Sequence, residues 1–152
     1  TEYLLSGRIP GTRATFRVAA SNAYGRSPWS AEFVAATADG VPATPAAPKP
    51  TLFGKASGEQ FVRLELTASA YAGVYGESVR YYQLEEVLIS QGGDRGISSI
   101  FNVSADEMAL ERSRINIKDY VYRARAVNSV GPSAWSGETL IPNDYTNVAS
   151  TP

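Results

Sequence analysis

The feature that most constrains the fold of this chain is an internal repeat. Residues 17–32 recur, without a gap, as residues 123–138, which lie 106 positions later. Half of the sixteen aligned positions are identical: Arg17, Ala20, Asn22, Gly25, Ser27, Trp29, Ser30 and Glu32. Such a period has the length of a small domain and is far longer than the roughly 20–50-residue units of solenoid proteins. We therefore expect two domains of one kind.

The positions of the two copies predict the domain organisation. Residues 1–37 are expected to be the C-terminal part (the last strands) of one domain, and residues 48–142 a complete second domain. Residues 38–47 are rich in proline and alanine, which predicts a short extended linker because proline fixes φ and lacks a backbone N–H. Residues 143–152 are expected to form a linker to a following domain. A few strands cannot bury both faces of a sandwich, so the upstream half of domain one should be required for folding.

Side-chain alternation with a period of two predicts β-strands over most of the complete domain. Val62, Leu64 and Leu66 share one face of a strand, and residues 120–126 alternate in the same way. Short strands separated by turn residues are typical of an antiparallel β-sandwich, so the expected fold class is all-β. One helical candidate, residues 105–112, would span at most about two turns.

These residues resemble the fibronectin type III family, whose domains are immunoglobulin-like antiparallel β-sandwiches. The family's hallmark is a tyrosine, alternating apolar positions, and then Ala-x-Asn-x-x-Gly-x-Ser. The second copy matches it at Tyr120, Tyr122, Ala124, Ala126, Asn128, Gly131 and Ser133. The first copy matches it at Phe16, Val18, Ala20, Asn22, Gly25 and Ser27. The resemblance implies a tandem of such sandwiches. The sequence departs from the family pattern at Ala14, where a tyrosine is usual, and at Leu66, where a tryptophan is usual.

The composition argues against catalysis. The chain contains no histidine and no cysteine, so zinc sites, Ser-His and Cys-His couples and disulfides are not expected. Glu85 and Glu86 are neighbours on a strand and point to opposite faces, so they cannot flank one substrate bond. We expect no enzyme, no metal and no cofactor.

Charge and hydropathy narrow the class of partner. The net charge is −1, which provides no field to attract nucleic acid or an anionic membrane. No apolar run approaches the roughly 18 residues of a membrane-spanning helix, so no membrane insertion is expected in this segment. The expected partners are other proteins or neighbouring domains of the same polypeptide.

The repeated tryptophans predict a cation–π contact. Alternation places Arg17, Arg123 and Arg125 on an outer sheet face, where Trp29 and Trp135 could fold over them, at about 0.5–1 kcal/mol per contact. The pattern resembles a reduced form of the Trp-Ser motif of cytokine-receptor fibronectin domains. We expect chiefly a structural clip made of Arg17 with Trp29 and of Arg123 with Trp135. A ligand-contact role is the alternative.

Two further sites are predicted on the same face. Tyr81, Gln83 and Glu85 should lie beside Arg123 and Arg125, either as cross-strand pairs or as a protein-contact surface. The triplet Asn102-Val-Ser104 is an acceptor sequence for N-glycosylation. The alternative is an ordinary strand asparagine followed by a loop serine.

Together these patterns predict a non-catalytic structural, adhesive or protein-interaction module. It would be a spacer segment of a larger multi-domain protein at the cell surface or outside the cell. An intracellular cytoskeletal or axonemal scaffold is the alternative, and an accessory module of a larger enzyme or virion tail protein is a third possibility.

Overall fold

The computed structural model describes residues 2–56, 59–90, 92–114 and 119–141, and these residues form strands and no α-helix. The strands of the N-terminal part are β1 (Arg13–Phe16), β2 (Ser21–Asn22), β3 (Gly25–Arg26) and β4 (Phe33–Ala36). The strands that follow are β5 (Lys49–Ala56), β6 (Glu59–Glu65), β7 (Tyr81–Ile89), β8 (Arg95–Ser104), β9 (Ala109–Arg114), β10 (Tyr120–Val127) and β11 (Thr139–Leu140). The expected linker at residues 143–152 lies outside the described residues.

Strands β5–β11 form an antiparallel β-sandwich. One sheet has the order β5-β6-β9 and the other the order β11-β10-β7-β8. This order places the first, second and fifth strands of the domain against the remaining four, which is the immunoglobulin-like arrangement. The expected fold class is confirmed.

The core lies between these two sheets and follows the alternation of the sequence. Val62, Leu64 and Leu66 from the β6 side meet Tyr82 and Leu84 from β7. On β10 the fully buried side chains are Tyr122, Ala124 and Ala126, as their spacing predicts. Burial of apolar surface stabilises the packed layers by roughly 25 cal/mol per Å², and this is the main contribution that holds the two sheets together.

The helical candidate at residues 105–112 does not form a helix. Residues 105–107 form a turn after β8, and the next strand, β9, begins at Ala109. A pattern of only about two turns has little helical stability of its own. Pairing with the central strand β6, from Glu65↔Ala109 to Gln60↔Arg114, provides backbone hydrogen bonds that an isolated helical segment of this length cannot match.

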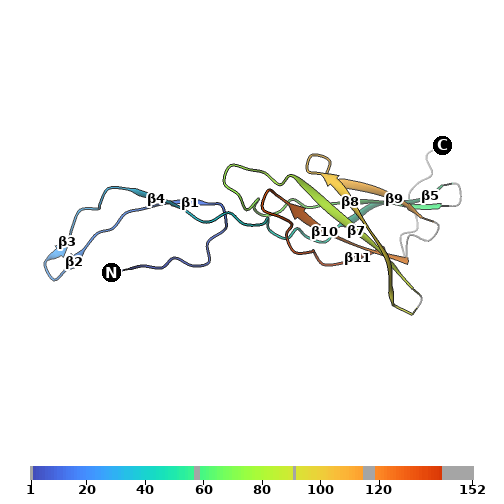
Figure 1. The fold of residues 1–152 in the computed structure, drawn as a ribbon, viewed down its shortest axis with the longest axis horizontal. Coiled ribbons are helices and arrows are strands. Elements are labelled where there is room, and N and C mark those ends of the chain that lie inside the picture. Colours follow the sequence, from blue (N-terminus) through green and yellow to red (C-terminus); the bar gives the residue numbers. More distant parts are fainter. Residues whose placement is uncertain (1, 57–58, 91, 115–118, 142–152) are drawn as a thin grey trace.

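Strands β1–β4 form a long hairpin that extends away from the sandwich (Figure 1). Strand β1 pairs with β4, β2 pairs with β3, and no other strand of the described residues pairs with either. The hairpin consequently exposes apolar side chains: Val18 is 72% exposed and Phe33 is 66% exposed. Its register matches that of the second copy, because Phe16 faces Phe33 and Tyr122 faces Thr139, each 106 positions further on.

Residues 38–47 run between the hairpin and the sandwich without regular structure. They do not lie free in solvent, since Pro42 and Pro45 are buried. The amide of Ala43 donates to the carbonyl oxygen of Tyr71 at 3.1 Å, in the loop between β6 and β7. The segment predicted as a linker is therefore packed along the second domain.

Candidate functional site

Both tryptophans lie over arginine side chains. In the second copy, Arg123 and Arg125 approach the Trp135 ring at 4.9 and 4.2 Å from its centroid. In the first copy, Arg17 lies 5.5 Å from the Trp29 centroid. Ala19 corresponds to Arg125, and the second guanidinium comes instead from Arg26, at 4.0 Å. The sequence predicted the Arg17 and Arg123 contacts but not that of Arg26.

Serine hydroxyls join each tryptophan segment to the preceding strand. Ser133 accepts the amide of Ala126 at 3.1 Å, and Ser136 accepts the amide of Ala124 at 2.9 Å. In return the amides of both serines donate to the carbonyl oxygens of the same alanines. Pro132 has no N–H, and the hydroxyls replace ladder bonds that a regular strand would form. Sequence reasoning treated these serines as matching positions only and assigned them no bonds.

The first copy repeats this serine bracket bond for bond. The hydroxyl of Ser27 accepts the Ala20 amide at 3.0 Å, and that of Ser30 accepts the Val18 amide at 3.0 Å. The four serines Ser27, Ser30, Ser133 and Ser136 thus define one local structure, used twice. Because it is made of hydrogen bonds between near neighbours in the chain, it forms in the same way in both contexts.

The polar residues of the outer face pair with one another. The Glu85 carboxylate accepts hydrogen bonds from Arg123 and from Ser98, the latter at 2.8 Å. Gln83 accepts from Arg125 at 2.8 Å and donates to Asn102 at 3.2 Å. These contacts cross β8, β7 and β10 in order.

Glu85 is only 7% exposed within this array. Burial alone would raise the pKa of its carboxyl. The hydrogen bonds from Arg123 and Ser98 and the charges of Arg123 and Arg95 outweigh burial, so the pKa of Glu85 lies below its usual value. Tyr81 begins the same strand and is half-buried beside these residues.

An ion pair on the outer face joins the two edges of the β11-β10-β7-β8 sheet. Arg95 at the start of β8 contacts Glu138, which lies just before β11. Since β7 and β10 are the central strands, this pair crosses both of them. The two valines of the outer face at this end, Val87 and Val121, are buried. The Glu138 position is part of the repeat, but its partner on β8 could not be identified from spacing.

Asn102 lies on edge strand β8 and is exposed. Its side-chain oxygen accepts the Gln83 hydrogen bond, which leaves the amide nitrogen, the atom that a glycan would modify, on the other side of the group.

Glu86 lies on the opposite face of β7 from Glu85, as expected, and is only 2% exposed. Its carboxylate accepts two hydrogen bonds from Arg112 of β9, both at 3.2 Å, and one from the hydroxyl of Tyr122 at 3.0 Å. The Arg112 guanidinium also stacks 4.0 Å from the Phe101 centroid. The sequence indicated the inward position of Glu86 but not its partners.

The junction between hairpin and sandwich is a close contact of backbone on backbone. A Cβ added at Gly11 would lie 2.6 Å from the carbonyl oxygen of Gly73, a distance that real Cβ atoms essentially never show. The Gly40 amide donates to that same oxygen at 2.9 Å. The side-chain amide of Asn128 donates to Gly40 O at 2.7 Å and to Ala72 O at 2.8 Å. Sequence reasoning missed this junction, for which the only signal was the glycines.

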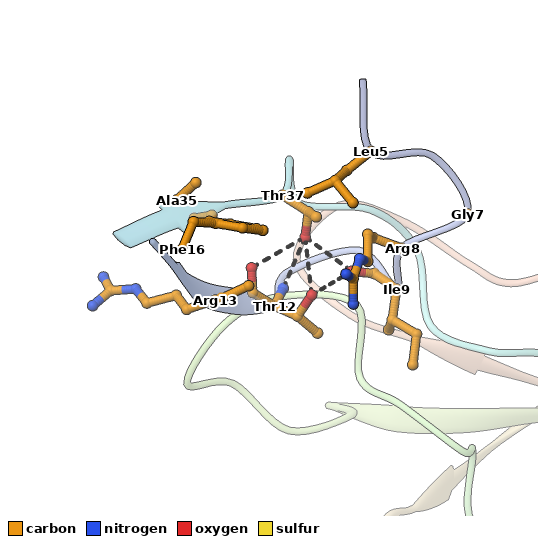
Figure 2. A pocket seen from close by; sticks show the side chains of 11 residues that line it. Leu5, Gly7, Arg8, Ile9, Thr12, Arg13, Phe16, Ala35 and Thr37 are labelled. Carbon is orange, nitrogen blue, oxygen red and sulfur yellow. Dashed lines mark hydrogen bonds between the residues drawn. The ribbon is translucent and has the colours of Figure 1, made fainter. Parts of the chain in front are cut away.

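A hollow lies on the hairpin beside this junction (Figure 2). It encloses about 660 Å³ and is lined by Leu5, Ala14, Phe16 and Ala35, among others. Thr37 lies at its floor, where its hydroxyl accepts the Thr12 amide and donates to the Ile9 carbonyl oxygen, both at 2.9 Å. The hollow opens on the same face of β1 as Phe16.

Within the described ranges, no group of three or more histidine, cysteine or acidic side chains is placed to hold a metal ion. The same residues include no helix with the length and apolar character needed to span a membrane.

Comparison with known proteins gives similarity at the level of structure. No protein-family model matches the chain, and no curated protein matches it in sequence. A crystal structure of the FN1–FN3 domains of chicken CNTN1 is similar, with a TM-score of 0.49 and 19% identity. The match covers 87% of this chain and 42% of that chain, so this chain spans less than half of its length. The fold assignment rests on the strand order described above.

Proposed function

We propose that this chain is a non-catalytic spacer and protein-interaction module in which two sandwich-type domains follow one another at a fixed angle. The observation that carries the proposal is the junction. Gly11, Gly40 and Gly73 bring three backbone segments together, and the buried side chain of Asn128 binds two of them. A flexible linker would need none of these contacts.

The proposal includes a division of the chain. Residues 1–37 are the last strands of one fibronectin type III-like domain, and residues 48–142 are a complete one. Residues 38–47 connect them. The bond-for-bond repetition of the serine bracket and the equal strand register support this division.

The outer face of the sandwich is the proposed contact surface for a protein partner. Tyr81, Gln83, Glu85, Arg123 and Arg125 form a flat polar array there. The pairing of Arg123 with Glu85 and of Arg125 with Gln83 holds these four side chains in place, which lowers the entropic cost of binding. The Trp135 clip holds Arg123 and Arg125 of this face in place, and Trp29 does the same for Arg17 on the hairpin.

The fixed junction can be tested by amide hydrogen exchange at Gly40. Gly73→Ala is compared with Gly76→Ala, since both glycines have positive φ in one loop but only Gly73 has neighbouring backbone where the new Cβ would lie. We expect Gly73→Ala to abolish the protection of the Gly40 amide and Gly76→Ala to preserve it. Rapid exchange at Gly40 in the unaltered chain would contradict a fixed junction.

The spacer role can be tested by small-angle scattering of the chain. The expected result is an elongated particle with the hairpin projecting from the sandwich, as in Figure 1. A compact particle, in which the hairpin folds back onto the sandwich, would exclude the spacer.

We further propose a surface or extracellular location, supported by the exposure of Asn102 on edge strand β8. Intact mass of the protein purified from its native source would show a hexose-containing adduct at this site. An unmodified Asn102 would favour the intracellular scaffold instead.

A further inference from the structure

The two copies of the hairpin differ in what covers them. On β10 the inward side chains of Tyr122, Ala124 and Ala126 are 0% exposed. Strand β7 pairs along the edge of β10 that faces away from β11, and the β5-β6-β9 sheet packs against its inner face. The equivalent face of the first copy has no such cover among the described residues. There Val18 is 72% exposed, although it corresponds to the fully buried Ala124.

The uncovered hairpin already has the conformation of the covered one. Phe16↔Phe33 and Tyr122↔Thr139 are the same register shifted by 106 positions, and the serine brackets match within about 0.1 Å in their hydrogen-bond lengths. A partner with the shape of strands β5–β9 would consequently fit the first hairpin without rearranging it. The hollow beside Phe16 lies on the face that such a partner would fill.

Charged residues of the first copy indicate the chemistry of this partner. In the second copy Arg123 pairs with Glu85 on the neighbouring strand, and Glu138 pairs with Arg95 on the strand beyond it. The first-copy equivalents, Arg17 and Glu32, contact only each other among the ion pairs of the described residues. That contact is a long 3.9 Å pair with both side chains more than half exposed. Such a pair contributes little to stability.

A difference between the copies adds a third requirement. Tyr122 donates its hydroxyl to the buried Glu86, whereas Phe16 at the equivalent position has no hydroxyl to donate. A carboxylate opposite Phe16 would lose that bond and lie buried beside an aromatic ring, which is unfavourable. The partner should therefore carry an apolar side chain opposite Phe16.

We propose that the free edge and inner face of the β1–β4 hairpin bind a half-sandwich of defined chemistry. Its first strand pairs antiparallel with β1 and carries a carboxylate opposite Arg17 and an apolar residue opposite Phe16. Its next strand carries a cation that reaches Glu32, and a second apolar sheet covers Val18 and Phe33. This inference rests on the proposed division of the chain into two sandwich-type domains, and it adds the identity of the side chains that complete the first one.

The test uses a complement that this chain itself contains. Residues 43–114, which hold β5–β9, are fused ahead of the intact chain, so that Glu85 and Arg95 of the added segment can meet Arg17 and Glu32. The added segment is prepared unaltered and with Glu86→Leu together with Arg112→Met, so that the apolar side chain opposite Phe16 leaves no buried guanidinium without its carboxylate. Because the chain has no cysteine, Val18→Cys supplies a single thiol whose rate of maleimide labelling reports cover of the inner face. Tyr24→Cys, at a side chain that is 99% exposed at the hairpin tip, is the matched control.

We expect the thiol at position 18 to react as fast as that at position 24 in the chain alone. In the fusion that carries Glu86→Leu and Arg112→Met in the added segment, it should react at least about 100-fold more slowly, since labelling then requires opening of the domain. The fusion that keeps Glu86 in the added segment should be less protected. Glu85→Lys in the added segment should remove protection, and Arg17→Glu in the hairpin should restore it.

Three outcomes would overturn the inference. Equal labelling at positions 18 and 24 in the fusion would mean that the hairpin does not accept the complement, even though the same strands cover β10. Protection at position 18 in the chain alone, with the mass of a dimer, would identify a second copy as the occupant. Protection that ignores the Glu85→Lys change would disprove the charge pattern. None of these results depends on the scattering experiment that tests the spacer.

Discussion

The hydroxyl of Tyr122 donates a hydrogen bond to Glu86 Oε2 at 3.0 Å in the interior of the sandwich. The two residues are directly opposed on β10 and β7, and Arg112 reaches the same carboxylate from β9 of the other sheet. The two layers are thus joined by a buried ionic and hydrogen-bonded link in an otherwise apolar core.

Removing one member of this link should be costly. Glu86→Leu leaves the Arg112 guanidinium without its carboxylate, and we expect a loss of about 3–5 kcal/mol in the free energy of unfolding. The double variant Glu86→Leu with Arg112→Met should recover most of that loss, because no buried charge then lacks its partner. Urea denaturation measures both, and additive losses in the double variant would contradict coupling.

The outer-face carboxylate should make stability depend on pH. The pKa of Glu85 is lowered in the folded protein from its ordinary value of 4.5, so its contribution is complete above that pH and is lost as the pH falls through the folded pKa. Glu85→Gln should cost about 1–2 kcal/mol at pH 7, and the difference from the unaltered protein should shrink below about pH 4.5. Glu65→Gln, at an exposed position on the other sheet, is the control and should show a small difference throughout.

The serine brackets offer a matched pair of variants. Ser136→Ala leaves the buried amide of Ala124 without an acceptor, which should cost about 1–3 kcal/mol. Ser30→Ala removes the same bond at an exposed site, where water replaces the hydroxyl, so the change should stay within about 0.5 kcal/mol. Equal effects on the urea midpoint would show that burial does not decide the value of this bond.

Asn128 is expected to stabilise the junction through both ends of its amide. Its oxygen accepts the amides of Val130 and Gly131, and its nitrogen donates to Gly40 and Ala72. Asn128→Asp places a carboxylate against two carbonyl oxygens and should cost about 2–3 kcal/mol in thermal or urea unfolding. The equivalent change at the exposed tip, Asn22→Asp, should be close to neutral, and a comparable loss there would argue against the junction as the cause.

The tryptophan clip should matter less than the buried contacts. Trp135→Ala removes two cation–π contacts at a half-buried site, and we expect a loss of about 1–2 kcal/mol, with Trp135→Phe in between. A loss above about 4 kcal/mol in urea denaturation would mean that Trp135 is part of the core rather than a cover for the arginines.

Several features were predictable because they depend on near neighbours in the chain. Alternation along Tyr120–Ala126 placed the core side chains of β10, and the repeat identified the two equivalent segments, though not the hydrogen bonds of their serines. The short helical candidate near Ala109 forms a strand instead, because pairing with β6 outweighs a weak local preference. The contact of Arg26 with Trp29 was not predicted, because Arg26 is not the repeat equivalent of Arg125. It lies on β3, after the turn that follows β2, and supplies the second guanidinium from there.

The sequence by itself determined the all-β pattern, the two related hairpins and the inward or outward direction of each side chain, since these follow from a two-residue period and from hydrogen bonds that close within about a dozen residues. Only the tertiary structure decided that Arg112 meets Glu86, that Arg95 meets Glu138, and that Gly11 lies against Gly73. Those contacts join segments far apart in the chain, so they exist only once the sheets have stacked and the hairpin has taken its place against the second domain.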